Sequence, residues 1–204
     1  MKWLSFDSPV MQAISRAADY ALLNILCLIC SLPLITAGAA LSAKYYVSMK
    51  LVREEAAPVF KTYFTSFLRN LKQTLLPGIV SVLGCGLLLW NWNYALSYES
   101  PAVYRWGLIL LSIFYMMIFL VFFVIIARYE ISNKEALKAA LGLTAAHFGR
   151  LLIAIAMVIV PLVISIWYLK WAWVICLFTQ CVMLHYNSRF FVKEFTRLEE
   201  KMGL

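Results

Sequence analysis

The sequence predicts an all-α integral membrane protein: a helical bundle with about five transmembrane helices and two cytoplasmic amphipathic helices. Of its 204 residues, 64% are hydrophobic and only 14% are charged, and the mean hydropathy is +0.83. Soluble domains average about 45–50% apolar and about 25% charged residues, so this composition is typical of membrane proteins. Long apolar runs and apolar stripes at helical spacing support the same class. Because no polar linker interrupts the chain, we expect a single membrane domain over residues 1–204.

Several apolar runs are long enough to be membrane spans. A helix of about 20 apolar residues crosses the hydrocarbon core of a bilayer. The longest run, from Trp106 to Ala127, contains no charged residue. We expect the first helix to run from about Pro9 to Leu32, to be amphipathic before it becomes apolar, and to stop at Pro33. The sequence predicts spans over about residues 20–36, 75–94, 106–127, 151–168 and 171–187.

Two amphipathic helices are predicted between the spans, over about residues 58–72 and 133–149. In each helix four residues recur at i, i+4, i+7 and i+11, which places them on one face. The first set is Phe60, Phe64, Phe67 and Leu71, and the second, 77 residues later, is Leu137, Leu141, Thr144 and Phe148. We interpret the pattern as a duplicated unit of surface helix, span, short loop and span. Such helices lie among lipid headgroups, pack against a partner or cap their own bundle.

Two shorter signals belong to the same loops. Ser132 followed by Glu135 fits a capping box, which predicts the start of the second amphipathic helix. Leu41, Tyr45 and Val52 indicate a further surface helix before residue 58.

The net charge is +8, and the 18 basic residues lie mainly between the apolar runs. The positive-inside rule accounts for this pattern, so we expect no nucleic-acid partner. Four basic residues lie in the loop 128–150 and four in the tail after residue 188. With five spans these regions and the loop before residue 75 share one side, which predicts a cytoplasmic C-terminus and an external N-terminus. The loop before residue 75 carries six candidate docking or lipid-facing residues: Lys44, Lys50, Arg53, Lys61, Arg69 and Lys72.

The sequence contains no constellation for catalysis, so we expect a non-enzymatic protein without a cofactor or a metal ion. Cys27 and Cys30 have the spacing of metal and redox sites, but both lie in an apolar run without a second pair. Cysteine in such a run usually serves as a small hydrophobic residue. His147 and His185 do not have a zinc-site or catalytic-triad spacing.

Two polar residues, Asn24 and Gln180, are candidates for positions inside the spans. Hydrogen bonding between helices is the favoured role for both side chains. A solute pathway is the other role, because polar residues inside a membrane often line one.

Several stretches, most of them in the first 75 residues, resemble one family. They are the Ser-Leu-Pro stretch within Cys30–Ala39, the pair Tyr45-Tyr46, and the run Arg53-Glu54-Glu55. These stretches are similar to the YesL-like family (DUF624) of bacterial integral membrane proteins. The resemblance implies a multi-pass protein of the bacterial cell membrane. It also implies genes that often lie beside those of sugar-uptake ABC transporters, and it carries over no catalytic residue.

Two functions are open at this stage. The first is a non-enzymatic accessory component of an ABC-type carbohydrate uptake system, which docks on permease subunits or anionic lipid through the six basic residues. Its link to sugar rests on the resemblance alone. The alternative is an autonomous permease for a small neutral solute, with Asn24 and Gln180 lining a polar cavity.

Overall fold

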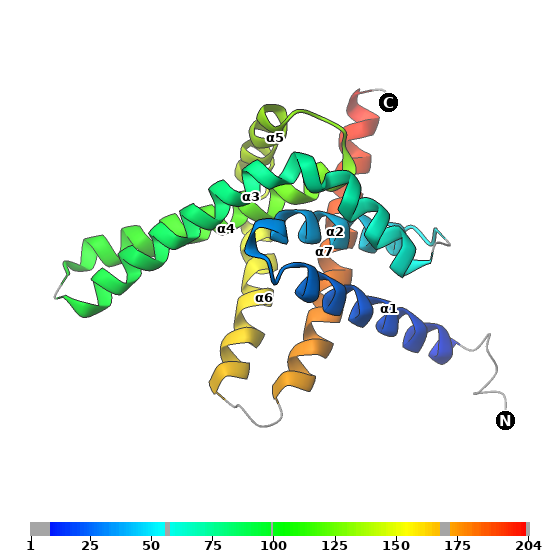
Figure 1. The fold of residues 1–204 in the computed structure, drawn as a ribbon, viewed down its shortest axis with the longest axis horizontal. Helices are drawn as coiled ribbons and strands as arrows, with labels where there is room; N and C mark the ends of the chain where they lie inside the picture. Colours follow the sequence, from blue (N-terminus) through cyan, green and yellow to red (C-terminus); the bar gives the residue numbers. More distant parts are fainter. Residues whose placement is uncertain (1–8, 56–57, 99, 168–171, 203–204) are drawn as a thin grey trace.

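Helices make up most of the chain that the structure, a computed structural model, describes: residues 9–55, 58–98, 100–167 and 172–202. The all-α class is therefore confirmed. Figure 1 shows two helical hairpins, α3–α4 and α6–α7, that extend in different directions from a central region around α2. The elements in chain order are α1 (Pro9–Cys30), the short 3₁₀ helix η2 (Leu34–Thr36), α2 (Ala37–Val52), α3 (Val59–Ser97), α4 (Ala102–Arg128), α5 (Asn133–Ala146), α6 (Phe148–Trp167) and α7 (Ala172–Met202).

The helix α2 lies at the centre of the fold, where it contacts α1, α3, α4 and α7 (Figure 1). Tyr45 and Val47 are buried, and small residues in the first turns let the neighbouring helices approach closely. A side-chain carbon at Gly38 would overlap the ring of Phe123 in α4. A helix is present at the predicted place in the sequence, between Leu41 and Val52. Its prediction as a surface helix is wrong, because other helices pack on several of its sides.

The last helix, α7, packs against α1 and α2 and completes the core around α2. The hydroxyl oxygens of Ser48 in α2 and Ser188 in α7 lie 2.6 Å apart, and both residues are buried. The rings of Tyr45 and Phe191 meet edge to face, with their centroids 5.8 Å apart. The helix continues to Met202, well beyond the predicted span 171–187.

The chain reverses direction inside the predicted first span, residues 20–36. The helix α1 ends at Cys30, and α2 then runs back beside it. The hydroxyl of Thr36 holds the reversal by donating to the carbonyl oxygens of Cys30 and Pro33, at 2.6 and 2.8 Å. The predicted helix from about Pro9 to Leu32 is confirmed, and it ends before Pro33, which cannot donate a backbone hydrogen bond. Residues 34–36 of the predicted span belong to η2 and not to this helix.

The helix α3 is a single helix of 39 residues, although the sequence predicts a surface helix over 58–72 and a separate span over 75–94. Pro77 lies inside it and has no N–H to donate to the carbonyl oxygen of Gln73, one turn earlier. The side-chain nitrogen of Asn133, at the start of α5, donates to that oxygen at 3.2 Å. The helix continues through the proline because α5 supplies the missing donor.

The buried face of α3 is polar and small rather than apolar. It is formed by Tyr63, Ser66, Asn70, Thr74 and Gly78, beginning at Val59. The predicted stripe lies on another face: Phe60 is 58% exposed, and Phe64 and Phe67 are only partly buried. Polar groups inside a membrane protein need hydrogen-bond partners, whereas apolar side chains can face lipid without a cost in free energy. The arrangement suits a helix that meets lipid on its outer side.

The buried positions of α3 and α5 keep the predicted repeat of 77 residues. The paired buried residues are Val59 and Ala136, Tyr63 and Ala140, and Ser66 and Leu143. The predicted capping box of Ser132 and Glu135 is confirmed at the start of α5. The two units then differ, because α3 continues as one helix, whereas α5 and α6 are separated by a bend of 96° at His147.

Three helices in the described part of the chain are long and apolar enough to cross a membrane: Met11–Cys30, Val59–Ser97 and Ala102–Arg128. The bent pair of Asn133–Ala146 and Phe148–Met157 meets the same criterion only when taken together. These apolar helices are compatible with a multi-pass membrane protein. The predicted total of five spans is not confirmed by them.

Candidate functional site

Three of the six predicted docking residues meet in one cleft between α2 and α3. This basic cleft has a volume of about 360 Å³. Lys50 comes from the last turn of α2, whereas Lys61 and Arg69 come from the first half of α3. The cleft is lined by Tyr46, Lys50, Pro58, Lys61, Thr62, Thr65, Ser66 and Arg69.

The ring of Tyr46 holds two of these cations in place. The ammonium nitrogen of Lys50 lies 5.3 Å from the ring centroid, and the guanidinium carbon of Arg69 lies 5.4 Å from it. Cations within about 6 Å of an aromatic centroid are attracted by the electron-rich ring face. One aromatic side chain therefore joins the basic residues of two helices into a single site.

Carboxylates approach the basic cleft only from its rim. Glu55 lies 3.4 Å from the Lys50 ammonium, and Glu130 lies 3.3 Å from a guanidinium nitrogen of Arg69. Their side chains are 43% and 83% exposed, so water screens both ion pairs. Lys61, the third cation of the cleft, is exposed. The cleft therefore keeps a positive character.

The structure places the other three predicted docking residues elsewhere. Lys44 is half-buried in α2 and lies close enough to Cys27 and Cys181 for its charge to act on both thiols. Arg53 lies beside Glu55, with 4.0 Å between a guanidinium nitrogen and a carboxylate oxygen. Lys72 is exposed on α3 and does not line the cleft. The structure therefore brings three of the six candidates into one cleft, whereas α2 turns Lys44 toward α1 and α7.

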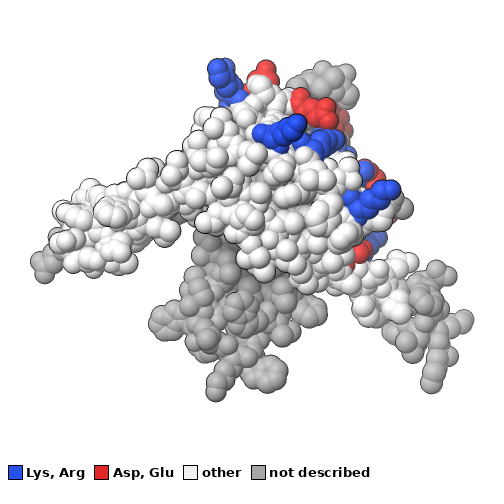
Figure 2. Space-filling model, viewed as in Figure 1, with Lys and Arg blue, Asp and Glu red and all other residues white. Residues whose placement is uncertain are grey.

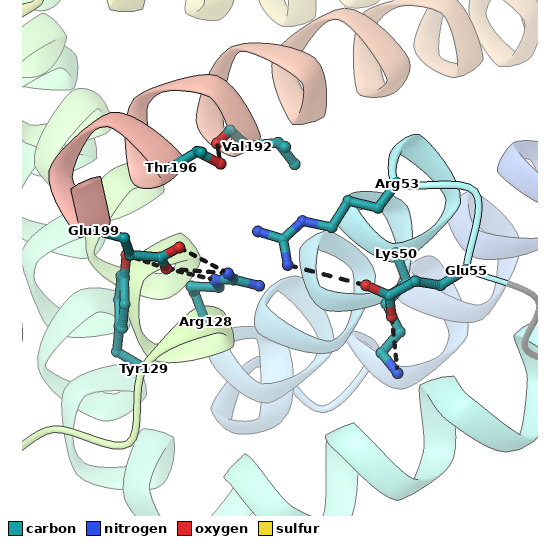
Figure 3. A network of polar contacts seen from close by, with 8 residues as sticks. All are labelled: Lys50, Arg53, Glu55, Arg128, Tyr129, Val192, Thr196 and Glu199. Atoms are coloured by element: carbon teal, nitrogen blue, oxygen red, sulfur yellow. Dashed lines mark hydrogen bonds and ion pairs between the residues drawn. The ribbon is translucent and has the colours of Figure 1, made fainter. Parts of the chain in front are cut away.

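A second polar cluster joins the ends of α4 and α7 beside the basic cleft. Figure 3 shows the guanidinium of Arg128 facing the carboxylate of Glu199, with Arg53 nearby. The Arg128–Glu199 contacts measure 3.0 to 3.3 Å, and the hydroxyl of Tyr129 donates to the same carboxylate at 3.0 Å. Burial and this neighbouring carboxylate raise the pKa of Tyr129 to about 12. The pair fixes the C-terminal helix against the loop between α4 and α5.

The pKa of Glu199 lies below its ordinary value. Burial alone would raise this pKa, but hydrogen bonds from Arg128 and Tyr129, with the positive charges of Arg128 and Arg53, outweigh burial. A carboxylate with a lowered pKa stabilises the fold above its ordinary pKa of 4.5, and this contribution is lost as the pH falls through the lowered value.

We expect Glu199→Gln to lower the melting temperature at neutral pH, because Arg128 loses its charged partner. The deficit should shrink below about pH 4, where the wild-type carboxylate takes up a proton. Thermal unfolding of the purified protein in detergent at about pH 7 and about pH 3.5 checks this expectation. Glu200→Gln, at the exposed next position, is the control and should have little effect at either pH. An equal deficit for Glu199→Gln at both values would contradict the assignment.

Sequence reasoning missed a third cluster, around Glu194 in α7. Its side chain is only 5% exposed, and three bases lie within 3.5 Å of its carboxylate: His147, Arg150 and Arg197. Arg197, one turn later in the same helix, was the only partner that the sequence signals. The other two come from the bend between α5 and α6, so they meet Glu194 only after folding.

Asn24, one of the two predicted intramembrane polar residues, lies where α1 meets α7. The side-chain nitrogen of Asn24 donates to the sulfur of Cys181 at 3.6 Å. Gln180 precedes Cys181 in α7 and is half-buried. Nearby, the hydroxyl of Tyr20 lies 2.8 Å from a ring nitrogen of His185. The structure therefore brings Asn24 and Tyr20 of α1 to one contact with Cys181 and His185 of α7.

Charged side chains gather at one end of the molecule. Figure 2 shows them around the α2–α3 connection and the ends of α5 and α7, whereas the α3–α4 hairpin presents an uncharged surface on this face. Within the residues that the structure describes, no group of three metal-ligating side chains is present. Apolar helices with a charged end are compatible with the class of multi-pass helical membrane proteins.

The comparison with known families gives a more particular result. Residues 20–92 match the family described as "Protein of unknown function, DUF624". The chain is thus consistent with a DUF624 family protein, and the matched segment contains α2 and the basic cleft. No curated protein and no solved structure matches the chain.

Proposed function

We propose that the protein is a non-enzymatic accessory component of the bacterial cell membrane that docks its basic cleft on a partner. The observation that supports this function is the meeting of Lys50, Lys61 and Arg69 on two packed helices. Residues fixed on helices present a docking surface without first having to become ordered, which favours binding. Positive charge on such a surface speeds association with an acidic partner and selects against basic ones.

The expected partner is a permease subunit of an ABC-type carbohydrate uptake system. This part of the proposal rests on the family resemblance, and the charge of the cleft adds one requirement to it. The partner must offer acidic residues at the level of the lipid headgroups, where the charged end of this protein lies in a bilayer. A docking function of this kind uses no catalytic residue.

Reversing the charge of the cleft is expected to abolish docking. The test variant carries Lys50→Glu, Lys61→Glu and Arg69→Glu, and it is purified by an affinity tag from native membranes in mild detergent. Wild-type protein should bring down a transporter subunit in near-equal amount, whereas the variant should recover less than about a tenth of it. Quantitative mass spectrometry of the eluates is the measurement.

A matched control carries three reversals outside the cleft: Lys72→Glu, Lys134→Glu and Lys138→Glu. The net charge changes by the same amount as in the test variant, because three basic residues again become acidic. All three side chains are exposed and none lines the cleft, so the cleft stays intact. The control should retain the partner. If both triple variants lose it, net charge rather than the cleft governs association, and the docking proposal fails.

We also propose a membrane topology that differs from the sequence prediction at the N-terminus. The charged end, including the C-terminal part of α7, is assigned to the cytoplasm by the positive-inside rule. An external N-terminus requires the first helix to cross the bilayer, but Arg16 in α1 contacts Glu54, just after α2, at 2.7 Å. This ion pair supports an α1–α2 hairpin that enters and leaves on the cytoplasmic side. The remaining helices α3, α4, α6 and α7 then account for the crossings.

A permease for a small neutral solute remains the second candidate, and one observation favours it. The side-chain oxygens of Asn24 and Asn187 are buried and have no hydrogen-bond partner among the described residues. Solute hydroxyl groups are suitable partners for such oxygens. Vesicles that contain the purified protein alone should then take up the solute, and Asn24→Leu should abolish uptake. Absence of uptake across a panel of neutral sugars and polyols would count against this function.

A further inference from the structure

We propose that the basic cleft binds a phosphate group. Its eight lining residues include three cations, Lys50, Lys61 and Arg69, and no carboxylate. Its volume of about 360 Å³ lies within the usual range of small-molecule sites and accommodates a phosphate with a small polar substituent. The inference rests on the proposed function for the choice of this face, and it names the chemistry that the face recognises.

The start of α3 lies at the edge of the cleft. Pro58, which lines the cleft, precedes the first helical residue, Val59, and no side chain caps this helix end. The first N–H groups of a helix have no partner within the helix, and the helix dipole makes this end positive. Phosphate groups bind at such ends in many proteins. Here Pro58, at the helix start, lines the same cleft as the three cations.

The cations are arranged before any ligand arrives. Tyr46 holds Lys50 and Arg69 over its ring, at 5.3 and 5.4 Å from the centroid. The guanidinium of arginine matches phosphate oxygens with two parallel N–H bonds, and lysine adds a compact charge. A ligand at this site therefore does not have to order long, flexible side chains.

The hydrogen bonds already made in the cleft favour an anion over a neutral sugar. The hydroxyls of Thr62 and Thr65 donate to the carbonyl oxygens of Pro58 and Lys61, both at 2.9 Å. Their protons are thus engaged, so the strongest donors that the lining offers to a ligand are its three cations. The rim carboxylates of Glu55 and Glu130 are exposed and weakly held, so a phosphate can displace them from their cations.

Two sources can supply this phosphate: the headgroup of an anionic phospholipid, or free phosphate in the cytoplasm. The first arm of the test adds phosphatidylglycerol or phosphatidylcholine to delipidated protein and counts bound lipids by native mass spectrometry. The second arm titrates inorganic phosphate, with chloride at equal ionic strength as reference, and follows the phosphorus-31 line width. Neither arm requires a partner protein, so failure here is distinguishable from failure of the docking experiment.

The test variant is Lys61→Gln with Arg69→Gln, and the control is Lys72→Gln with Lys138→Gln. Both carry the same change in charge, but only the first alters the cleft. We expect the cleft variant to weaken binding about tenfold or more, because two charge-assisted contacts are lost, and the control to bind as wild type. Thermal unfolding verifies that both variants fold.

Selective retention of phosphatidylglycerol assigns the site to lipid, and a response to inorganic phosphate without lipid selectivity assigns it to the free ion. Equal loss of binding in the two variants, or no binding by the wild type in either arm, would overturn the proposal.

Discussion

Gly78→Ala is expected to lower the free energy of unfolding by about 1–3 kcal/mol, the usual effect of forcing an extra carbon into a packed contact. Alanine's new carbon would lie 2.9 Å from the backbone oxygen of Ile35. That oxygen cannot move away easily, because the Thr36 hydroxyl ties the reversal after α1 to two carbonyl oxygens. Unfolding of the purified protein by heat or by denaturing detergent measures the effect.

Gly86→Ala, two turns further along α3, is the matched control. A side-chain carbon at Gly86 would meet nothing within 4 Å. Alanine is favoured over glycine in a helix by up to about 1 kcal/mol, so this variant should be neutral or slightly more stable. If both variants have the same stability, the contact between α3 and the α1–α2 reversal does not contribute as the structure indicates.

A cysteine introduced near the start of α1 is expected to react only from the cytoplasmic side. We propose Ser15→Cys in a chain whose five native cysteines are replaced by alanine. Ser15 is exposed and precedes Arg16, which contacts Glu54 at 2.7 Å. An impermeant maleimide should leave this position unlabelled in intact cells and label it fully once the membrane is opened. Gel-shift analysis measures the fraction of protein labelled in intact cells relative to the fraction labelled after the membrane is opened.

Two further positions calibrate this experiment. Ser97→Cys, at the end of α3 in the α3–α4 hairpin, should be labelled in intact cells. Thr196→Cys, exposed in the C-terminal part of α7, should behave like Ser15→Cys. Labelling of Ser15→Cys as well as Ser97→Cys in intact cells would contradict the proposed topology. It would support the external N-terminus that the sequence predicts.

The sequence predicts the helical class well, because that class depends on local patterns. The capping box at Ser132 and the 77-residue register appear in the structure. The place of α2 could not be predicted in the same way. Its basic residues indicate a surface helix, but Gly38 and Ala43 let four other helices surround it. Which neighbours cover a helix depends on contacts that no local window contains.

The candidate site was predictable in part for the same reason. Lys61 and Arg69 lie eight residues apart in one helix, so their shared face follows from helical spacing. Lys50 joins them only because α2 packs against α3, and Lys44 is excluded because α2 turns it toward α1 and α7. The cluster around Glu194 gave no local signal beyond Arg197, because its other bases come from a distant bend.

The contact between Ser48 and Ser188 joins positions 140 residues apart, so the order of synthesis matters for this protein. The ribosome delivers α2 early, but the helix that closes its polar side emerges last. Until then the hydroxyl of Ser48 has only the carbonyl oxygen of Tyr45, in its own helix, as a partner, and the face of α2 that α7 covers stays open. Chains that stop before α7 should therefore be degraded by membrane proteases, so that the C-terminal helix decides whether a newly made molecule survives.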